Sequence, residues 1–181
     1  MNDDPWFESC EGRDLAQGDL LYRCNVLKWQ AEDVSPDGQI DVTEVATDVV
    51  VLTQSCDLEN DGKTDYVLLA ELINYDQLVR DFPNQKYGGK EFRSNCSRGR
   101  YPKLSLLPPF AGPPALNWSI VDFSHLYTLP KSIIADHAAS MGLRLRMRSP
   151  YREHLSQSFA RYFMRVGLPE GLGAFDRYSP A

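Results

Sequence analysis

Residues 47–60 read Thr-Asp-Val-Val-Val-Leu-Thr-Gln-Ser-Cys-Asp-Leu-Glu-Asn, and in this stretch an apolar run meets a cluster of small polar side chains. Residues 49–52 are mostly β-branched and do not alternate with polar residues, so they predict a short central strand that is covered on both faces. Residues 53–57 follow at once with hydroxyl, amide, thiol and carboxylate groups. Side chains at the end of a buried strand are well placed for a site, so we expect candidate chemistry here.

The chain has 181 residues, of which 43% are hydrophobic, and this is enough for one domain over 1–181 with a sizeable core. Punctuation by glycine and proline divides it into an N-terminal arm (1–17), a β-rich core (18–82), a loop and proline-rich segment (83–117), a strand-helix-strand-helix unit (118–168) and a tail (169–181). No stretch approaches the roughly 20 apolar residues of a membrane helix. The first residues lack the basic and apolar regions of a signal peptide, so we expect a cytoplasmic protein without a membrane partner.

The cysteines are widely separated and include no Cys-x-x-Cys pair; they are Cys10, Cys24, Cys56 and Cys96. This spacing argues against a disulfide framework and against a zinc site. His125 and His137 fall in separate predicted elements without the spacing of metal ligands. We therefore expect neither a metal nor another cofactor.

The net charge is -6, which disfavours nucleic acid as a partner because nucleic-acid binding relies on basic surface. The charge is uneven, since acidic residues dominate up to Asp81 and arginines and lysines dominate much of the second half. Two interpretations stand: a local site for phosphate or carboxylate, or a solvated basic face with salt bridges to the acidic half. We favour the second.

Hydrophobic periodicity predicts an α+β fold built on a curved, mainly antiparallel sheet. The expected elements are strands at 20–27, 39–45, 49–52, 66–72, 103–107, 119–128 and 143–147, turns at 18–19, 35–38 and 61–63, and a helix at 130–139. The end of the 66–72 strand could equally begin a helix through Leu78 and Val79. We interpret 83–100 as a mobile surface loop or flap, the prolines of 108–114 as irregular structure, and the 143–147 strand as half-buried with a basic outer face.

An amphipathic helix over 150–166 is expected to cover the sheet. Ser149 can cap its start, Pro150 suits its first position, and Gly167 with Pro169 ends it. Its apolar face contains Tyr151, Leu155, Phe159, Tyr162, Phe163 and Val166.

Arg152 projects inside that apolar face, and a buried guanidinium requires a hydrogen-bonded counter-charge. We expect Asp57 to be the partner, with Asp48 and Asp122 as alternatives. On this hypothesis Arg152→Ala lowers stability rather than a specific activity.

Cys56 beside Asp57 is the most suggestive dipeptide, and Gln54 and Ser55 next to it are candidate binding residues. A cysteine nucleophile needs a base or a cation, which a histidine (125, 137 or 154) or a helix arginine would supply, whereas an adjacent carboxylate raises a thiol pKa. We favour the alternative in which Cys56 is buried and inert and Asp57 caps a turn or pairs with Arg152.

A polar stripe borders the apolar face of the helix, with His154, Ser158, Arg161 and Arg165 at helical spacing. Together with Arg152 it would suit an anion or phosphodiester, with His154 as general acid or base. Borders of amphipathic helices are commonly basic, so the stripe is also explained as a solvated surface.

Gly18-Asp19-Leu20-Leu21, the run 49–53 and Tyr66-Val67-Leu68-Leu69 are similar to the opening of the PemK/MazF-like toxin fold. The resemblance covers about the first 70 residues and implies a small, strongly bent SH3-like barrel and, in active toxins, RNA cleavage. Thr47-Asp48 stands where that family usually has an arginine. The 54–58 turn and the 149–154 helix start also resemble small uncharacterised bacterial proteins.

No complete catalytic set is visible, while the aromatic arm, the 83–100 loop and the 108–114 stretch offer surfaces for another protein. We therefore expect a bacterial binding or regulatory module, a protein-interaction component of a multi-gene system such as toxin-antitoxin or phage defence. The alternative is a hydrolase, either cysteine-dependent through Cys56 or a PemK-like ribonuclease that uses His154 and its arginines.

Overall fold

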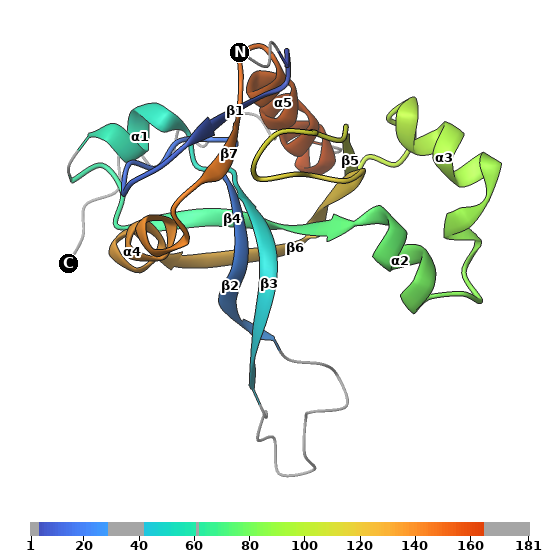
Figure 1. Ribbon diagram of the computed structural model, residues 1–181, viewed down its shortest axis with the longest axis horizontal. Coiled ribbons are helices and arrows are strands. Elements are labelled where there is room, and N and C mark those ends of the chain that lie inside the picture. The colour runs from blue at the N-terminus through green and yellow to red at the C-terminus, as the bar shows by residue number, and fades with distance from the viewer. Residues whose placement is uncertain (1–3, 29–41, 61, 165–181) are drawn as a thin grey trace, which may run out of the picture.

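The computed structural model describes residues 4–28, 42–60 and 62–164. They form a five-stranded sheet of order β2-β3-β4-β6-β5 and a two-stranded sheet of β1 and β7 (Figure 1). The strands are β1 (Phe7–Cys10), β2 (Leu20–Lys28), β3 (Thr43–Val51), β4 (Tyr66–Asn74), β5 (Leu104–Leu107), β6 (Ser119–Pro130) and β7 (Arg144–Met147). The helices are α1 (Ser55–Glu59), α2 (Tyr75–Asp81), α3 (Lys90–Ser97), α4 (Lys131–Met141) and α5 (Tyr151–Phe163), with a 3-10 turn η2 (Lys86–Gly88).

Every named strand pair is antiparallel, so the predicted α+β class and the mainly antiparallel sheet are confirmed. In the described part of the chain β2 and β5 are the edges of the larger sheet, which is not closed, and a barrel is therefore not confirmed. No described helix combines the length and the apolar character that crossing a membrane requires.

The valine run lies in β3, and Val49, Val50 and Val51 are all completely buried. Val50 belongs to the core cluster on one face of the sheet, whereas Val49 and Val51 belong to the cluster on the other face. Coverage of both faces is thus confirmed. The strand begins earlier than predicted, because 43–45 and 49–51 form one element. The predicted turn at 35–38 lies outside the described residues.

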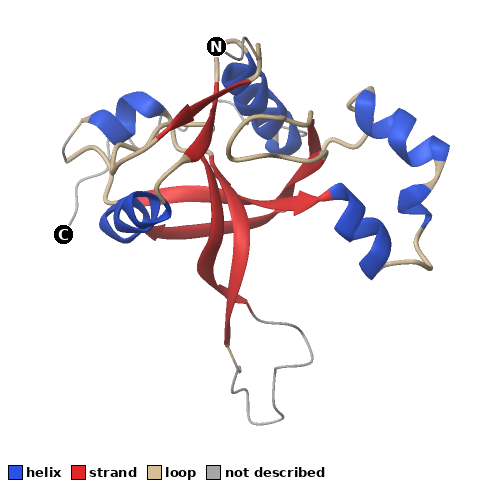
Figure 2. Ribbon diagram, viewed as in Figure 1, coloured by secondary structure: helices blue, strands red, loops and turns tan. Residues whose placement is uncertain are grey.

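Two helices, rather than the C-terminal helix alone, cover the larger sheet. Leu155 of α5 packs with the first core cluster, and Ile134 of α4 packs with the second. Strand alternation sends neighbouring side chains to opposite faces, so each helix serves one face. Figure 2 shows α5 beside the β1–β7 pair and α4 apart from it.

Helix α5 docks as predicted but begins and ends differently. Phe159 and Tyr162 contact the Phe123 ring, with centroids 5.6 and 6.5 Å away. Pro150 rather than Ser149 occupies the N-cap position, and no side chain caps the helix. The helix ends at Phe163; residues 165–181, including Val166, Gly167 and Pro169, lie outside the described residues.

The aromatic N-terminal arm packs onto the body of the protein. Phe7 is buried and pairs in register with Met147 across β1 and β7. Trp6 stacks on Tyr151 of α5 with ring centroids 3.9 Å apart. The arm therefore ties the start of the chain to β7 and α5.

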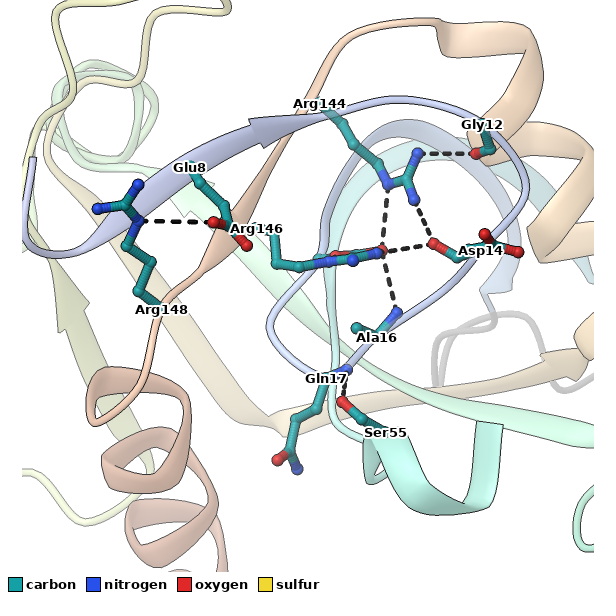
Figure 3. Close-up of polar contacts among 10 residues, drawn as sticks. Glu8, Gly12, Asp14, Ala16, Gln17, Ser55, Arg144, Arg146 and Arg148 are labelled. Carbon is teal, nitrogen blue, oxygen red and sulfur yellow. Dashed lines mark hydrogen bonds and ion pairs between the residues drawn. The ribbon is translucent and has the colours of Figure 1, made fainter. Parts of the chain in front are cut away.

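The predicted basic outer face of β7 is wrong. Arg144 has no exposed side-chain area, and its Nε donates to Asp19 Oδ2 at 3.1 Å. Its other nitrogens donate to the carbonyls of Gly12 and Asp14 (Figure 3). Arg146 Nε donates to the second Asp19 oxygen. The Arg144 guanidinium can be buried on this side of β7 because Asp19 and the carbonyls of the loop before β2 accept its hydrogen bonds.

Gly18 makes the predicted turn before β2. Its φ is 83°, and a Cβ there would lie 2.8 Å from Cβ of Met147. Its N–H donates to the Val51 carbonyl at 2.9 Å, and its carbonyl accepts from Met147 N–H at 3.0 Å. Glycine is required because the chain passes between two strands in a left-handed conformation.

Residues 83–100, predicted as a loop, instead contain η2 and α3. Phe92 explains the difference, because its ring contacts Tyr75, Tyr87 and Tyr101 at centroid distances of 6.4, 5.1 and 5.3 Å. These aromatics form a small core of their own, and their irregular spacing gives no periodic signal. Most other expectations are confirmed: strands at 20–27, 66–72, 103–107 and 119–128, a helix after Pro130, and no regular element over 108–114 apart from an isolated bridge at Phe110.

Candidate functional groove

The sheet face that α4 covers continues past this helix as the floor of a groove of about 1000 Å³. Leu69 packs in the α4 cluster, and Glu71, two residues further along β4, points to the same face. Residues of the β2–β3 hairpin form one wall and residues of α2 form the other (Figure 1). We call this the β4–β6 groove.

A bulge in β6 shapes the floor. Ala70 pairs with Leu126, but the next residue, Glu71, pairs with Asp122, so three residues of β6 have no partner on β4. Phe123 of the bulge is buried in the core, while Ser124 and His125 are exposed. Bulges commonly redirect side chains beside functional sites, and this one brings Asp122 opposite Glu71.

Asp122 orients His125. The carboxylate accepts the Ser124 N–H at 2.8 Å and the Ser124 hydroxyl, and its Oδ2 lies 3.3 Å from His125 Nδ1. A carboxylate can only accept, so the neutral ring carries its proton on Nδ1 and leaves a lone pair on Nε2. The Asp122 side chain is 9% exposed and that of His125 60%, an arrangement that suits a general base facing solvent.

Glu71 sits at the centre of a second set of contacts. It accepts from Lys28 Nζ and from the Tyr127 hydroxyl, each at 2.9 Å, and from the Thr47 hydroxyl at 3.3 Å. Burial, followed by the negative charge of Glu71, raises the pKa of Tyr127 above its usual value. Tyr127 therefore stays protonated and donates to Glu71, and Lys28 balances the carboxylate, so the floor is rigid and largely neutral.

The rims of the groove, which its two walls form, differ from the floor because each wall carries a carboxylate and an exposed apolar side chain. Asp48 and Leu27 line the hairpin wall, and Asp81 and Phe82 line the wall at the end of α2. Leu27 is 64% exposed and Phe82 52%. Burial raises the pKa of Asp48, while the N–H of Arg23, 2.8 Å from its Oδ1, opposes that rise.

The predicted site at 54–57 lies elsewhere, on α1. Cys56 is exposed, so the expectation of a buried thiol is wrong. Its sulfur lies 3.6 Å from Asp57 Oδ1 and 3.7 Å from Gln54 Oε1. The hydroxyl of Ser55 accepts the Gln17 N–H at 3.1 Å, which anchors the loop before β2.

No imidazole accompanies that thiol among the described contacts. His125 faces Asp122, His137 Nε2 lies 2.9 Å from the Tyr22 carbonyl oxygen, and the His154 ring packs against Tyr151 at 6.1 Å. Cys56 therefore has no base among its described contacts. The one cation near it, Lys63, is paired with Asp57, and that carboxylate opposes formation of a thiolate.

The predicted Asp57–Arg152 pair is also wrong. Asp57 pairs with Lys63 at 3.1 Å, and Arg152 pairs with Glu153 at 2.9 Å. The alternatives fail too, because Asp48 accepts from the Arg23 N–H and Asp122 contacts Ser124 and His125. The Arg152 side chain is 37% exposed, so it reaches solvent and requires no buried counter-charge.

The polar stripe on α5 is a row of surface residues. His154 and Arg161 are exposed and Ser158 is half-buried, and the described structure contains no hydrogen bond or ion pair among them. Arg165 lies outside the described residues. The stripe thus forms no preorganised anion site in the described part of the chain.

The groove residues missed by the sequence argument left one signal. Glu71 lies between Ala70 and Leu72, and Asp122 lies between Val121 and Phe123, so each is a carboxylate inside an apolar strand. Such residues are rarely buried without partners, and the pattern singles out both strands. The bulge that joins them to His125 has no sequence signature of its own.

No known family model matches the chain, and the comparison with curated proteins finds no match either. The resemblance to PemK/MazF-like toxins therefore stays a prediction. Within the described ranges, no group of three or more His, Cys, Asp or Glu residues is arranged to hold a metal ion.

Proposed function

We propose that this protein is a binding module whose β4–β6 groove holds a segment of a partner protein that carries basic and apolar side chains. One observation carries the proposal: each wall presents a carboxylate and an exposed apolar residue, Asp81 next to Phe82 at the end of α2, and Asp48 with Leu27 further along the β2–β3 hairpin. A cationic side chain would meet a carboxylate on either wall, and its apolar neighbours would bury Leu27 and Phe82.

The size and charge of the groove support a peptide rather than a small anion. About 1000 Å³ is at the upper end of ordinary ligand sites. Four carboxylates line it (Asp48, Glu71, Asp81 and Asp122) against two lysines (Lys28 and Lys103). Lys28 already balances Glu71, and Asp122 is engaged by Ser124 and His125, so the rim carboxylates are the ones that remain for a partner. The expected setting is a bacterial multi-gene system of the toxin-antitoxin or phage-defence kind.

Charge reversal on α2 tests the proposal. A fluorescein-labelled peptide of alternating lysine and leucine is titrated with the protein, and binding is followed by anisotropy. Asp81→Lys should weaken binding roughly tenfold, since one lost ion pair and one new repulsion amount to more than about 1.4 kcal/mol. Asp76→Lys is the matched control, because Asp76 is exposed on the same helix and does not line the groove. Equal weakening by both variants, or no binding by the wild type, would refute the proposal.

A second candidate, hydrolysis with His125 as general base, rests on the Asp122–His125 contact at 3.3 Å. In this reaction His125 Nε2 takes a proton from water, the oxygen attacks an ester, and the imidazolium returns the proton to the leaving group. This chemistry needs no thiol, which separates it from the hypothesis based on Cys56.

p-Nitrophenyl acetate and bis(p-nitrophenyl) phosphate provide the assay. His125→Ala should remove activity, and Asp122→Asn should reduce it roughly 100-fold by releasing the ring, within the usual range for general-base catalysis. His154→Ala is the control, because His154 is an exposed histidine outside the groove. A wild-type rate equal to that of His125→Ala rejects the hydrolase and leaves the binding module unaffected.

A further inference from the structure

Positive charge is concentrated in one short segment of this acidic protein. Residues 86–103 hold six of the 19 lysines and arginines of the chain but only one of its 25 aspartates and glutamates. The six are Lys86, Lys90, Arg93, Arg98, Arg100 and Lys103. They lie on η2, α3 and the turn into β5, and Figure 1 shows this unit at one end of the sheet, away from α1 and α4. We call it the α3 unit.

The cations of the α3 unit are available to a ligand. All six residues are exposed. None of them takes part in an ion pair within the described structure, although Arg93 donates to the Gly88 carbonyl and Arg100 contacts Asn95 Oδ1 at 3.4 Å. The expectation that basic residues of the second half pair with the acidic half is therefore wrong for this unit. Cations without ion-pair partners that share one short unit repel one another, and an anionic ligand relieves that repulsion.

A pocket of about 430 Å³ lies between α3 and the strands β5 and β6. Lys90, Arg93 and Arg98 line it together with the side chains of Phe92 and Trp118. Trp118 is 47% exposed, although indole rings are usually buried. The pocket thus combines an accessible aromatic face with three cations.

We infer that the α3 unit binds single-stranded nucleic acid, with a base stacked on Trp118 and phosphates held by Lys90, Arg93 and Arg98. Proteins that bind single strands combine aromatic platforms with a basic path for the backbone, and this pocket contains both. Its volume suits one nucleotide unit. The base of a duplex is stacked inside the helix and would not reach the indole, so single strands are favoured.

An acidic protein segment is the main rival ligand, because it would satisfy the same cations. It offers no planar ring for the exposed indole, and Trp118 then has no role. The overall charge of -6 does not oppose the proposal, because the acidic residues lie outside 86–103 with the one exception of Glu91. Electrostatic attraction acts locally, since salt screens it within about 8–10 Å.

Fluorescence titration with the oligonucleotides dT15 and U15 tests the inference on the full chain. Binding should quench tryptophan emission, and Trp118→Phe should remove most of that quenching although Trp6 and Trp29 are unchanged. Trp118→Ala should weaken binding roughly 5- to 150-fold, the range expected for one stacked base. With three phosphate contacts, log K should fall against log salt with a slope of about -2. Equal binding of the two oligonucleotides would mean that no 2′-hydroxyl is read.

Charge reversals locate the surface. Arg93→Glu should weaken binding roughly tenfold or more and reduce the salt slope by about one. Arg161→Glu is the matched control, because Arg161 is an exposed arginine on α5 and its reversal changes the net charge equally. Circular dichroism of each variant checks that α3 is still folded.

Three results would overturn the inference: tighter binding of a duplex, loss of binding in Arg161→Glu but not in Arg93→Glu, or a polyglutamate peptide that binds as tightly as dT15. None of these depends on the β4–β6 groove. Asp81→Lys should leave oligonucleotide binding in place while it weakens peptide binding, so the two proposals can fail separately.

Discussion

Asp19 Oδ2 accepts the Arg144 Nε–H at 3.1 Å, and neither side chain has any exposed area. The pair joins the start of β2 to β7, and through the carbonyls of Gly12 and Asp14 it also fixes the loop before β2 (Figure 3). Because both charges are removed from water, each depends on the other for its solvation. This contact, rather than one below α5, is the central ion pair of the fold.

Removal of Arg144 should therefore be strongly destabilising. Arg144→Met leaves Asp19 buried with Arg146 as its remaining cationic partner among the described residues, and loss of one member of a buried pair typically costs about 3–5 kcal/mol. Urea unfolding followed by circular dichroism measures the change. Arg13→Ala is the control, since its ion pair with Asp136 has side chains 60% and 65% exposed and should contribute less than about 1 kcal/mol. A loss below about 1 kcal/mol in Arg144→Met would mean that water or Arg146 replaces the missing guanidinium.

Arg152→Ala should have little effect on stability, contrary to the expectation from sequence. Its only ion pair in the described structure is with Glu153, and the two side chains are 37% and 45% exposed. Exposed pairs contribute about 0–1 kcal/mol. The same urea experiment decides the matter, and a loss as large as that of Arg144→Met would show that Arg152 carries a buried charge after all.

These two arginines indicate what the sequence could and could not predict. Helical spacing correctly predicts α5 and its docking face. The angle around a helix does not say how far a long side chain extends, so the same spacing wrongly places Arg152 in the interior. Alternation correctly gave β7 as a strand, but it could not reveal that the outer side of β7 is covered by the loop before β2. Long-range contacts decide both burials.

The same limit explains the candidate sites. The end of the valine strand was accessible to prediction because it is local, yet Cys56 and Asp57 contact only near neighbours in the sequence. The register of β4 and β6 brings Glu71 and Asp122 together, and the bulge in β6 turns His125 toward solvent. Neither the register nor the bulge follows from periodicity. The basic segment was visible as composition, but its pocket requires Trp118 from a distant part of the chain.

Stability should fall with rising pH in the alkaline range because of Cys24. Burial, and after it the charge of Asp48, raises the pKa of this thiol from 9.0 to about 12. Above pH 9 the thiol loses its proton in the unfolded state but keeps it in the folded state, so the folded state binds more protons. The free energy of unfolding therefore decreases as pH rises toward about 12. The slope for one proton is about 1.4 kcal/mol per pH unit.

Urea midpoints between about pH 9 and pH 11 measure this dependence. Cys24→Ala should flatten the curve, whereas Cys56→Ala, which removes an exposed thiol, should not. Burial also raises the pKa of Tyr22 to about 12, so this tyrosine adds a similar loss of stability at alkaline pH. The stability of Cys24→Ala should therefore depend on pH less steeply than that of the wild type, but it should still decrease. Identical curves for wild type and Cys24→Ala would contradict the assignment.

The contact between Glu71 and Tyr127 can be measured directly in the groove. Burial is the larger cause of the raised pKa of Tyr127 and the Glu71 charge the next, so Glu71→Gln should lower that pKa without restoring its usual value. Ultraviolet absorbance of phenolate against pH reports the change, and subtraction of the Tyr127→Phe titration isolates this tyrosine from the other eight of the nine in the chain. Glu59→Gln, an exposed glutamate on α1, should leave the titration unchanged. If Glu71→Gln titrates as the wild type does, the carboxylate and the phenol are not in contact, and the rigid floor on which both groove proposals rest is absent.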